Sequence, residues 1–519
     1  MGNKINLYEE ERKMNQKIRK RIMSFCLGGL LLLLPLLASC DIGNKALEDD
    51  TTETTAGETT DAVTERMDKE PADMPHDEKL LIGGVNITSY RIVYGRSPLS
   101  RKCSSTGKTI GEDIGRFLQG DEADCEFDYQ TAVRLRDLIK EYYGYDVEVV
   151  KDSETPDESR YEILVGYTDR RASTEAKNEL TDQTEHFKVC SNPYSNSKKK
   201  TQYLVCGGSF GATWHAVDEI EAFLKENQNA VSTDLSDLKV EKGKYDFTVV
   251  ACVGDSITRG SQALPQGVYG NANSLTAKFG DSATAIYFEQ YMGYPATLQR
   301  EMWKDAIVYN FGRGGSTMRN YGDSNYYGAC EQFKKCLDIS NSDIDFDIVI
   351  MMHGTNDIGY NGYIENWDDA GKADFGVELK NQIDKIKVGS PNAKFVVNNT
   401  PHAVSELKTP GGSMTSKRYT MLRDIELQAV KDLKTAGYDV YHYDMNRFTI
   451  ENLGTGCSDD YNSEVNAHKD FYNIINDSNA KDPLHPNYRG YGVIADGMVD
   501  LVNYLVNGTP SLKYMIDIG

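Results

Sequence analysis

Residues 247–258 read Phe-Thr-Val-Val-Ala-Cys-Val-Gly-Asp-Ser-Ile-Thr, an apolar run that ends in a glycine, an aspartate and a serine. Such a run before a glycine turn is typical of a strand that is buried on both faces of a parallel sheet. Similar runs recur towards the C-terminus, and stretches of helical periodicity separate them. The predicted strands are Phe247–Val253, Ala306–Tyr309, Ile348–Met352, Lys394–Val397 and Tyr438–Tyr441, and the predicted helices are Pro295–Trp303, Phe375–Val388 and Ser416–Ala436. This alternation predicts an α/β fold: a three-layer α/β/α domain with a parallel sheet over residues 245–519.

Polar residues follow three of these strands, where the active sites of parallel sheets are found. Ser256 follows the first strand, Gly315 lies in a glycine-rich loop after the second, and Asn356 follows the third. Each has a plain alternative: Asp255 or Ser256 capping a helix, glycines that supply positive φ angles, and an asparagine that closes a turn. A dinucleotide-binding GxGxxG motif is disfavoured, because position 317 is a threonine.

A fourth polar block lies near the C-terminus, where Asp482-Pro-Leu-His485-Pro-Asn precedes a predicted helix, Tyr491–Val506. A carboxylate three residues before a histidine can hold the imidazole Nδ1–H and leave Nε2 free for a serine hydroxyl. A single histidine after a loop is usually structural. Four such blocks at strand ends and in a C-terminal loop are much harder to obtain by chance.

Together the four blocks resemble the SGNH (GDSL-type) hydrolase superfamily over residues 245–508, which implies a flavodoxin-like three-layer fold and a serine esterase. The resemblance implies that Ser256 is the nucleophile, His485 the general base and Asp482 the residue that orients it. The oxyanion donors would be the backbone N–H groups of Ser256 and Gly315 and the side chain of Asn356. Neither a metal nor a cofactor is needed. The 59 residues from Ser256 to Gly315 are more than compact members have, and the extra chain, about 262–292, is expected to cover the site.

The region from 81 to 244 is expected to form a smaller α+β domain. Its predicted strands are Ile92–Tyr94, Val147–Val150, Tyr161–Val165, Phe187–Val189 and Tyr203–Val205, and its predicted helices are Phe127–Tyr143 and Gly211–Leu224. It weakly resembles the non-catalytic N-terminal domain of family 20 glycoside hydrolases and α-glucuronidases, through element order and phrases such as Tyr161–Gly166. No titratable cluster in this region suggests chemistry, and His215 is expected to be structural.

The first forty residues combine basic residues, a hydrophobic run and the ending Leu-Ala-Ser-Cys, which together predict an export signal. The ending resembles the bacterial lipobox, so lipidation of Cys40 is expected, with the chain exported and anchored to the outer face of a bacterial membrane. An uncleaved signal anchor is the alternative. Residues 41–80 hold thirteen acidic residues and no aromatic residue, which predicts a disordered tether. The net charge of −22 argues against a nucleic-acid partner.

These features favour an exported serine ester hydrolase. Among such enzymes, a carbohydrate O-acetylesterase on the cell surface is preferred. The alternatives are a lipase, lysophospholipase or thioesterase of the same superfamily, or an inactive carbohydrate-binding surface protein. A glycosidase is disfavoured, because no carboxylate pair has a comparable strand-end context. Cys206 and Cys252 are expected to be small hydrophobic residues of strands. The acyl group, the alcohol, the disulfide pairing and the oligomeric state are not indicated.

Overall fold

The computed structural model describes residues 79–95, 127–152, 161–180, 183–191, 202–260, 293–319, 345–359, 364–401, 407–409, 412–414, 416–453, 472–474, 481–508, 512–516 and 518. For residues 359, 407–409, 412–414, 416, 472–474, 481–483 and 488 it describes the backbone alone. Cys40, the leader, residues 41–78 of the expected tether and the stretch 262–292 lie outside the described residues. Leu80, which was expected to end the tether, is instead buried at the start of strand β1 (Leu80–Ile82). Within the described part of the chain, no helix combines the length and the apolar character that crossing a membrane requires.

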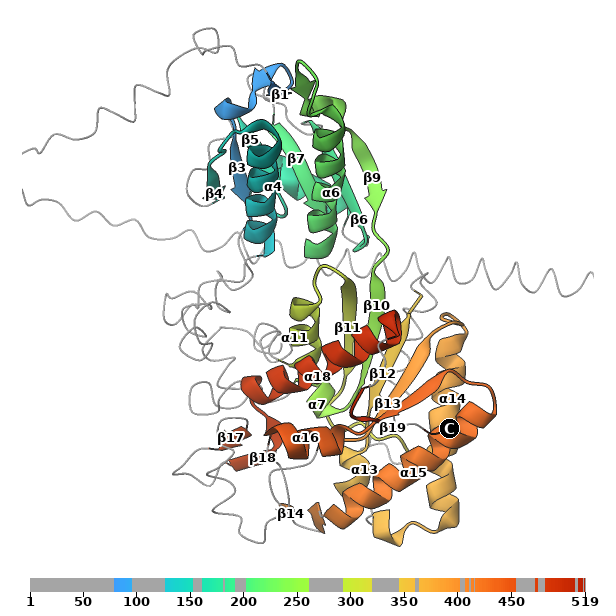
Figure 1. The fold of residues 1–519 in the computed structure, drawn as a ribbon. Coiled ribbons are helices and arrows are strands. Elements are labelled where there is room, and N and C mark those ends of the chain that lie inside the picture. The colour runs from blue at the N-terminus through green and yellow to red at the C-terminus, as the bar shows by residue number, and fades with distance from the viewer. Residues whose placement is uncertain are drawn as a thin grey trace, which may run out of the picture. The chain divides into compact units, whose positions relative to one another are not determined.

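The C-terminal sheet has six strands in the order β11-β10-β12-β13-β16-β19 (Figure 1). Its strands are β10 (Thr248–Gly254), β11 (Ala306–Gly312), β12 (Ile348–Met352), β13 (Lys394–Asn398), β16 (Val440–Tyr443) and β19 (Met515–Ile516). The first five run parallel, which confirms the predicted α/β class. The edge strand β19 pairs antiparallel with β16 and was not predicted, because two residues carry too little pattern.

Helices cover both faces of this sheet, so its strands are apolar on both sides. Val250 and Cys252 of β10 belong to one core, whereas Ala251 and Val253 belong to the other. The first core packs against α11 (Tyr294–Glu301), α16 (Met445–Leu453) and α18 (Tyr488–Asn507), and the second against α14 (Asp369–Lys387) and α15 (Ser416–Thr435). Because successive residues of β10 face two different cores, the strand is apolar at every position from Val249 to Val253. Cys206 and Cys252 are buried free thiols, as expected of strand hydrophobes.

Several short elements lie between the main strands and helices of the C-terminal domain. They are α7 (Ser256–Arg259), α13 (Thr355–Gly359), the 3-10 helix η6 (Ile364–Asn366), and the antiparallel pairs β14 (Leu407–Thr409) with β15 (Gly412–Met414) and β17 (Tyr472–Ile474) with β18 (Lys481–Pro486). The helices α7 and α13 each begin directly beyond the carboxyl end of a parallel strand. The blocks that contain Ser256 and Asn356 therefore fall where strands turn into helices.

The N-terminal region forms a second six-stranded sheet in the order β4-β3-β5-β7-β6-β9. Its elements are β3 (Arg91–Tyr94), α4 (Phe127–Tyr143), β4 (Val149–Lys151), β5 (Glu162–Val165), α5 (Arg171–Glu179), β6 (His186–Ser191), β7 (Gln202–Gly207), α6 (Phe210–Asn227) and β9 (Val240–Lys244). A small sheet of β1 (Leu80–Ile82), β2 (Val85–Asn86) and β8 (Thr233–Asp234), with the 3-10 helices η2 (Ile87–Ser89) and η5 (Leu235–Asp237), accompanies it. The strands β4, β3, β5 and β7 are parallel, whereas β6 pairs antiparallel with both β7 and β9, so the sheet is mixed.

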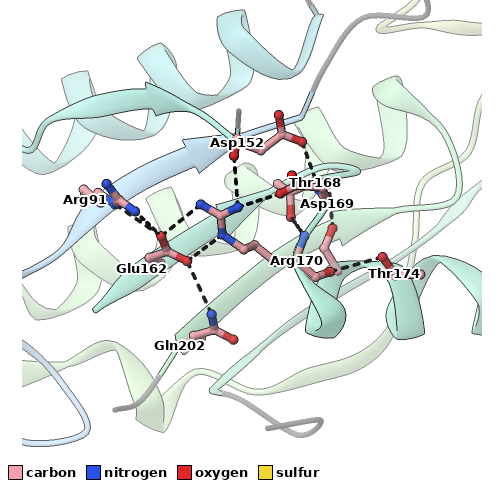
Figure 2. A network of polar contacts seen from close by, with 9 residues as sticks. Arg91, Asp152, Glu162, Thr168, Asp169, Arg170, Thr174 and Gln202 are labelled. Atoms are coloured by element: carbon pink, nitrogen blue, oxygen red, sulfur yellow. Dashed lines mark hydrogen bonds and ion pairs between the residues drawn. The ribbon is translucent and has the colours of Figure 1, made fainter. Parts of the chain in front are cut away.

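Sequence reasoning missed a buried charged network in this second sheet (Figure 2). Arg91, Glu162 and Gln202 are neighbours in register on three adjacent strands, and Glu162 is fully buried. The Nε of Arg170 donates to Glu162 Oε2 at 3.0 Å, and that of Arg91 donates to Oε1 at 3.2 Å. Removing one partner would leave a buried charge uncompensated, so we read this network as structural.

His215 of α6 behaves as the sequence leads one to expect. Its Nδ1 lies 2.5 Å from Asp218 Oδ2, its Nε2 lies 2.7 Å from the carbonyl of Lys304, and its ring stacks on that of Tyr245. With both ring nitrogens and one ring face engaged, this histidine has a structural role.

Candidate active site

Ser256 lies at the sharp turn between β10 and α7. The side chain of Asp255 caps α7 by accepting the N–H of Ile257 at 2.9 Å. The capping interpretation of this block is therefore correct for Asp255, and it leaves the Ser256 hydroxyl available for another partner. A Cβ atom at Gly254 would lie 2.1 Å from Thr258 Oγ1 and 2.2 Å from the carbonyl oxygen of Met352. The glycine is thus required by close packing in the turn.

The structure brings Ser256 and His485 together. His485 Nε2 lies 2.8 Å from Ser256 Oγ, although 229 residues separate the two in the chain. His485 lies near the end of β18, and Asn487 then caps α18 by accepting the N–H groups of Arg489 at 2.9 Å and Gly490 at 3.1 Å. The capped helix fixes the direction in which the chain leaves the histidine. A hydroxyl and an imidazole nitrogen at this distance are arranged for proton transfer.

Asp482 and His485 lie within strand β18 and not in the loop that was expected, and the Cα of Asp482 pairs with that of Asn473 on β17. The side chain of Asp482 lies outside the described residues. The expected contact between this carboxylate and the imidazole of His485 therefore stays a prediction.

The glycine-rich loop after β11 lies beside the serine. Gly315 adopts a φ of +80°, a conformation that disfavours every side chain, and no atom lies within 4 Å of where its Cβ would be. A Cβ at the preceding Gly314 would lie 3.9 Å from Ser256 Cβ. The positive φ that the sequence suggests is therefore present at Gly315, and at Gly314 the loop passes close to Ser256.

Asn356 joins this loop from α13. Its Nδ2 donates to the carbonyl of Ser316 at 2.9 Å, and the residue is 8% exposed. Because an amide nitrogen carries two protons, one proton holds the loop and the second is available for a bound oxygen atom. Gly315 and Asn356 are thus connected through Ser316, at the same edge of the sheet as Ser256.

Asp357, the next residue, was missed by sequence reasoning. Its carboxylate accepts the backbone N–H of Met318 at 2.9 Å and that of Arg319 at 3.1 Å, and it is fully buried. Burial raises the pKa of Asp357 to about 6. The available signal was an aspartate directly after Asn356 at a strand end.

Two further titratable groups at this edge, Asp255 and His353, are buried, and burial shifts the pKa of each towards its neutral form. Burial raises the pKa of Asp255 to about 6, and it lowers the pKa of His353, directly after β12, to about 4. His353 is therefore neutral at pH 7, so among the histidines of the third and fourth blocks only His485 is placed to exchange a proton with Ser256.

Comparison with known proteins adds the following findings. Residues 250–498 match the family model described as GDSL-like Lipase/Acylhydrolase. Comparison with curated proteins gave no match. Among solved structures, a family two carbohydrate esterase from Clostridium thermocellum is 15% identical over 51% of this chain and 66% of that chain, with a TM-score of 0.33. A putative arylesterase from Agrobacterium tumefaciens is 16% identical over 50% of this chain and 100% of that chain, with a TM-score of 0.31.

Proposed function

Because residues 250–498 belong to the GDSL-like lipase/acylhydrolase family and the protein is thus a serine esterase, we propose that Ser256 is its nucleophile and His485 its general base. The observation that carries this assignment is the distance of 2.8 Å between His485 Nε2 and Ser256 Oγ. Gly315, Asn356 and the backbone N–H of Ser256 are proposed as the oxyanion donors. Asp482 is proposed to orient His485.

The reaction proceeds in two halves. Ser256 Oγ attacks the ester carbonyl carbon while His485 Nε2 accepts the hydroxyl proton, and the carbonyl electron pair moves onto the oxygen, which the three donors hold. The carbon–oxygen bond to the alcohol then breaks, and the leaving alkoxide takes the proton from His485. Water attacks the acyl-serine as His485 accepts its proton. Collapse of this second intermediate releases the carboxylic acid, and Ser256 regains its proton.

The proposed substrate is an O-acetylated carbohydrate outside the cell. The support comes from the predicted export signal, the predicted tether and the weak resemblance of the N-terminal region to a domain of sugar-processing enzymes. The stretch 262–292 holds the aromatic residues Tyr269, Tyr287, Phe288 and Tyr291, which could stack on a sugar ring and lie outside the described residues. We therefore propose an esterase that removes a small acyl group from a carbohydrate.

The substrate test compares initial rates on p-nitrophenyl acetate and octanoate, followed by acetate release from acetylated xylan, with deacetylated xylan as the control. We expect the acetyl ester to be preferred and acetate to be released from the polysaccharide. A preference for the octanoyl ester would favour the lipase alternative. No turnover, together with no labelling of Ser256 by a fluorophosphonate, would contradict the catalytic assignment and favour a carbohydrate-binding protein.

We propose in addition that the mature protein is held at the outer face of a bacterial membrane by lipidation of Cys40. Two acyl chains on one residue hold a protein firmly, since each buried methylene contributes about 0.8 kcal/mol. Cys40→Ala should move the protein from the membrane fraction to the soluble fraction and abolish incorporation of radiolabelled palmitate. Unchanged membrane association of that variant would favour an uncleaved signal anchor.

A further inference from the structure

The loop that carries Gly315 is held at both of its ends by hydrogen bonds. On one side, the N–H of Arg313 and the hydroxyl of Ser316 donate to the carbonyl of Gly254, at 2.9 and 3.0 Å. Gly254 ends the strand that leads to Ser256, two residues further on. This side of the loop is therefore tied to the strand of the proposed nucleophile.

On the other side, two consecutive residues of α13 hold the loop. Asn356 Nδ2 donates to the carbonyl of Ser316 at 2.9 Å. The two carboxylate oxygens of Asp357 accept separate backbone N–H groups, those of Met318 at 2.9 Å and Arg319 at 3.1 Å. Only an ionised carboxylate offers acceptors alone on both of its atoms, so neither an amide nor a hydroxyl could replace this pair of bonds.

Gly315 lies between these two anchors and has no side chain with which to hold its own position. No atom lies within 4 Å of where its Cβ would be. The direction of its N–H therefore depends on the anchors around it. Resting on the function proposed above, we propose that Asp357 is a positioning residue of the oxyanion hole, which sets the Gly315 N–H and the Asn356 amide towards one point beside Ser256.

The burial of Asp357 shows what this arrangement requires. Its residue is 0% exposed, and a buried carboxylate is costly unless hydrogen bonds compensate it. Burial, opposed by the two N–H bonds, raises the pKa of Asp357 to about 6, so the group is mainly ionised at pH 7. The cost of holding this charge inside the domain is therefore offset by the two N–H bonds, which also fix the loop beside the proposed nucleophile.

The test is Asp357→Asn in the full chain, since it keeps the shape and replaces one acceptor with a donor that faces a backbone N–H. We expect kcat to fall about 100-fold with KM within about threefold, because a donor misplaced by about 1 Å costs that much. Active-site titration with a fluorophosphonate, taken to completion, counts folded sites, so kcat is given per competent molecule. A change in KM alone, or a loss of rate that only follows the folded fraction, would overturn the proposal.

Asp444→Asn is the control for loss of a buried carboxylate charge elsewhere in the domain. Asp444 is also buried, directly before α16, and its Oδ1 accepts both the backbone N–H of Arg447 at 3.0 Å and the side-chain N–H of Asn399 at 2.9 Å. This variant should keep kcat per site within about twofold, because neither of these two bonds involves the residues that flank Gly315. Equal losses of kcat in both variants would contradict a role specific to Asp357.

If Asp357→Asn does not fold, Asp357→Glu carries the test, because it keeps both acceptors but is one methylene longer. A folded glutamate variant with wild-type kcat would refute the proposal, whereas a loss of about tenfold would support it. The proposed function has a separate test: Ser256→Ala with wild-type rates would overturn the nucleophile assignment, whatever Asp357 shows. An inactive Ser256→Ala beside a fully active Asp357→Asn would overturn the positioning role alone.

Discussion

At the scale of single residues, Ser256 differs from its neighbours in what its hydroxyl faces. Asp255 takes the capping bond at the start of α7, and Ser316 uses its hydroxyl to bind the carbonyls of Gly254 and Arg313. The hydroxyl of Ser256 instead lies 2.8 Å from His485 Nε2. The proposed chemistry thus depends on one hydroxyl that the local backbone does not use.

Ser256→Ala should abolish turnover and leave the fold intact. The substitution removes the attacking oxygen. It also removes the partly buried hydrogen bond to His485, which contributes little to packing. We expect kcat on p-nitrophenyl acetate to fall at least about 10⁴-fold, as for other enzymes that lose the nucleophile. Steady-state rates and far-UV circular dichroism measure the two parts; a variant with wild-type rates would exclude Ser256 as the nucleophile.

Asp482→Asn should lose much less activity than His485→Ala. The histidine transfers the proton itself, whereas a carboxylate behind it only orients the ring and stabilises its charged form. We expect kcat to fall at least about 10⁴-fold for His485→Ala and by a clearly smaller factor for Asp482→Asn, measured side by side on one substrate. Equal losses in the two variants would show that the carboxylate has a more direct part in the reaction.

At the scale of elements, the site depends on how closely α7 packs against the end of β11. A Cβ at Gly312 would lie 2.1 Å from the backbone nitrogen of Arg259 in α7. Backbone atoms cannot yield as a flexible side chain can. The position of α7, and with it that of Ser256, therefore requires glycine at the end of the neighbouring strand.

Gly312→Ala should lower both stability and kcat, because the added methyl group must push α7 away from β11. Overpacking of this kind costs about 1–3 kcal/mol in the free energy of unfolding, and a shift of α7 should reduce kcat at least tenfold. Gly492→Ala in α18 is the control, since nothing lies within 4 Å of its Cβ position and its φ is not positive. Thermal melts and kinetics of both variants test this; wild-type kcat in Gly312→Ala would contradict it.

At the scale of the whole molecule, buried histidines and buried carboxylates respond to pH in opposite directions. Burial lowers the pKa of His353 and of His442 to about 4, whereas it raises the pKa of Asp255 and of Asp357 to about 6. Below pH 6.5 these histidines bind protons in the unfolded chain but stay neutral in the folded protein. The free energy of unfolding therefore decreases as the pH falls. The carboxylates keep protons that the unfolded chain releases above pH 3.8, so their contribution to stability is present at low pH and lost as pH rises to 6.

His442→Gln isolates one of these contributions. Relative to wild type, the variant should gain about 3 kcal/mol in the free energy of unfolding as pH falls from 7 to 4, because it no longer has a histidine that must stay neutral. Next to it, burial raises the pKa of Glu426 well above its usual value, and Glu426 Oε2 lies 3.4 Å from His442 Nε2. Urea unfolding of both proteins at several pH values measures the difference; a difference that is independent of pH would contradict a neutral, buried His442.

Local sequence patterns predict the five parallel strands of the C-terminal sheet and the blocks that follow them. Runs such as Ile348–Met352 are apolar at every position because both faces of the sheet are covered, and this pattern is local to a few residues. The same holds for α4, whose predicted bounds of Phe127–Tyr143 are those in the structure. Local signals of this kind also placed Ser256, Gly315 and Asn356 at strand ends. They failed for α5, which has few apolar residues along its nine positions.

Which of these groups meet depends on contacts between distant parts of the chain. The approach of His485 to Ser256 joins segments 229 residues apart, and no local periodicity encodes such a distance. The bonds from Asp357 to Met318 and Arg319 likewise cross 39 and 38 residues. Two backbone N–H groups leave no mark in the sequence, since every residue except proline carries one. Their role as anchors arises only when parallel strands bring separate turns to a common edge.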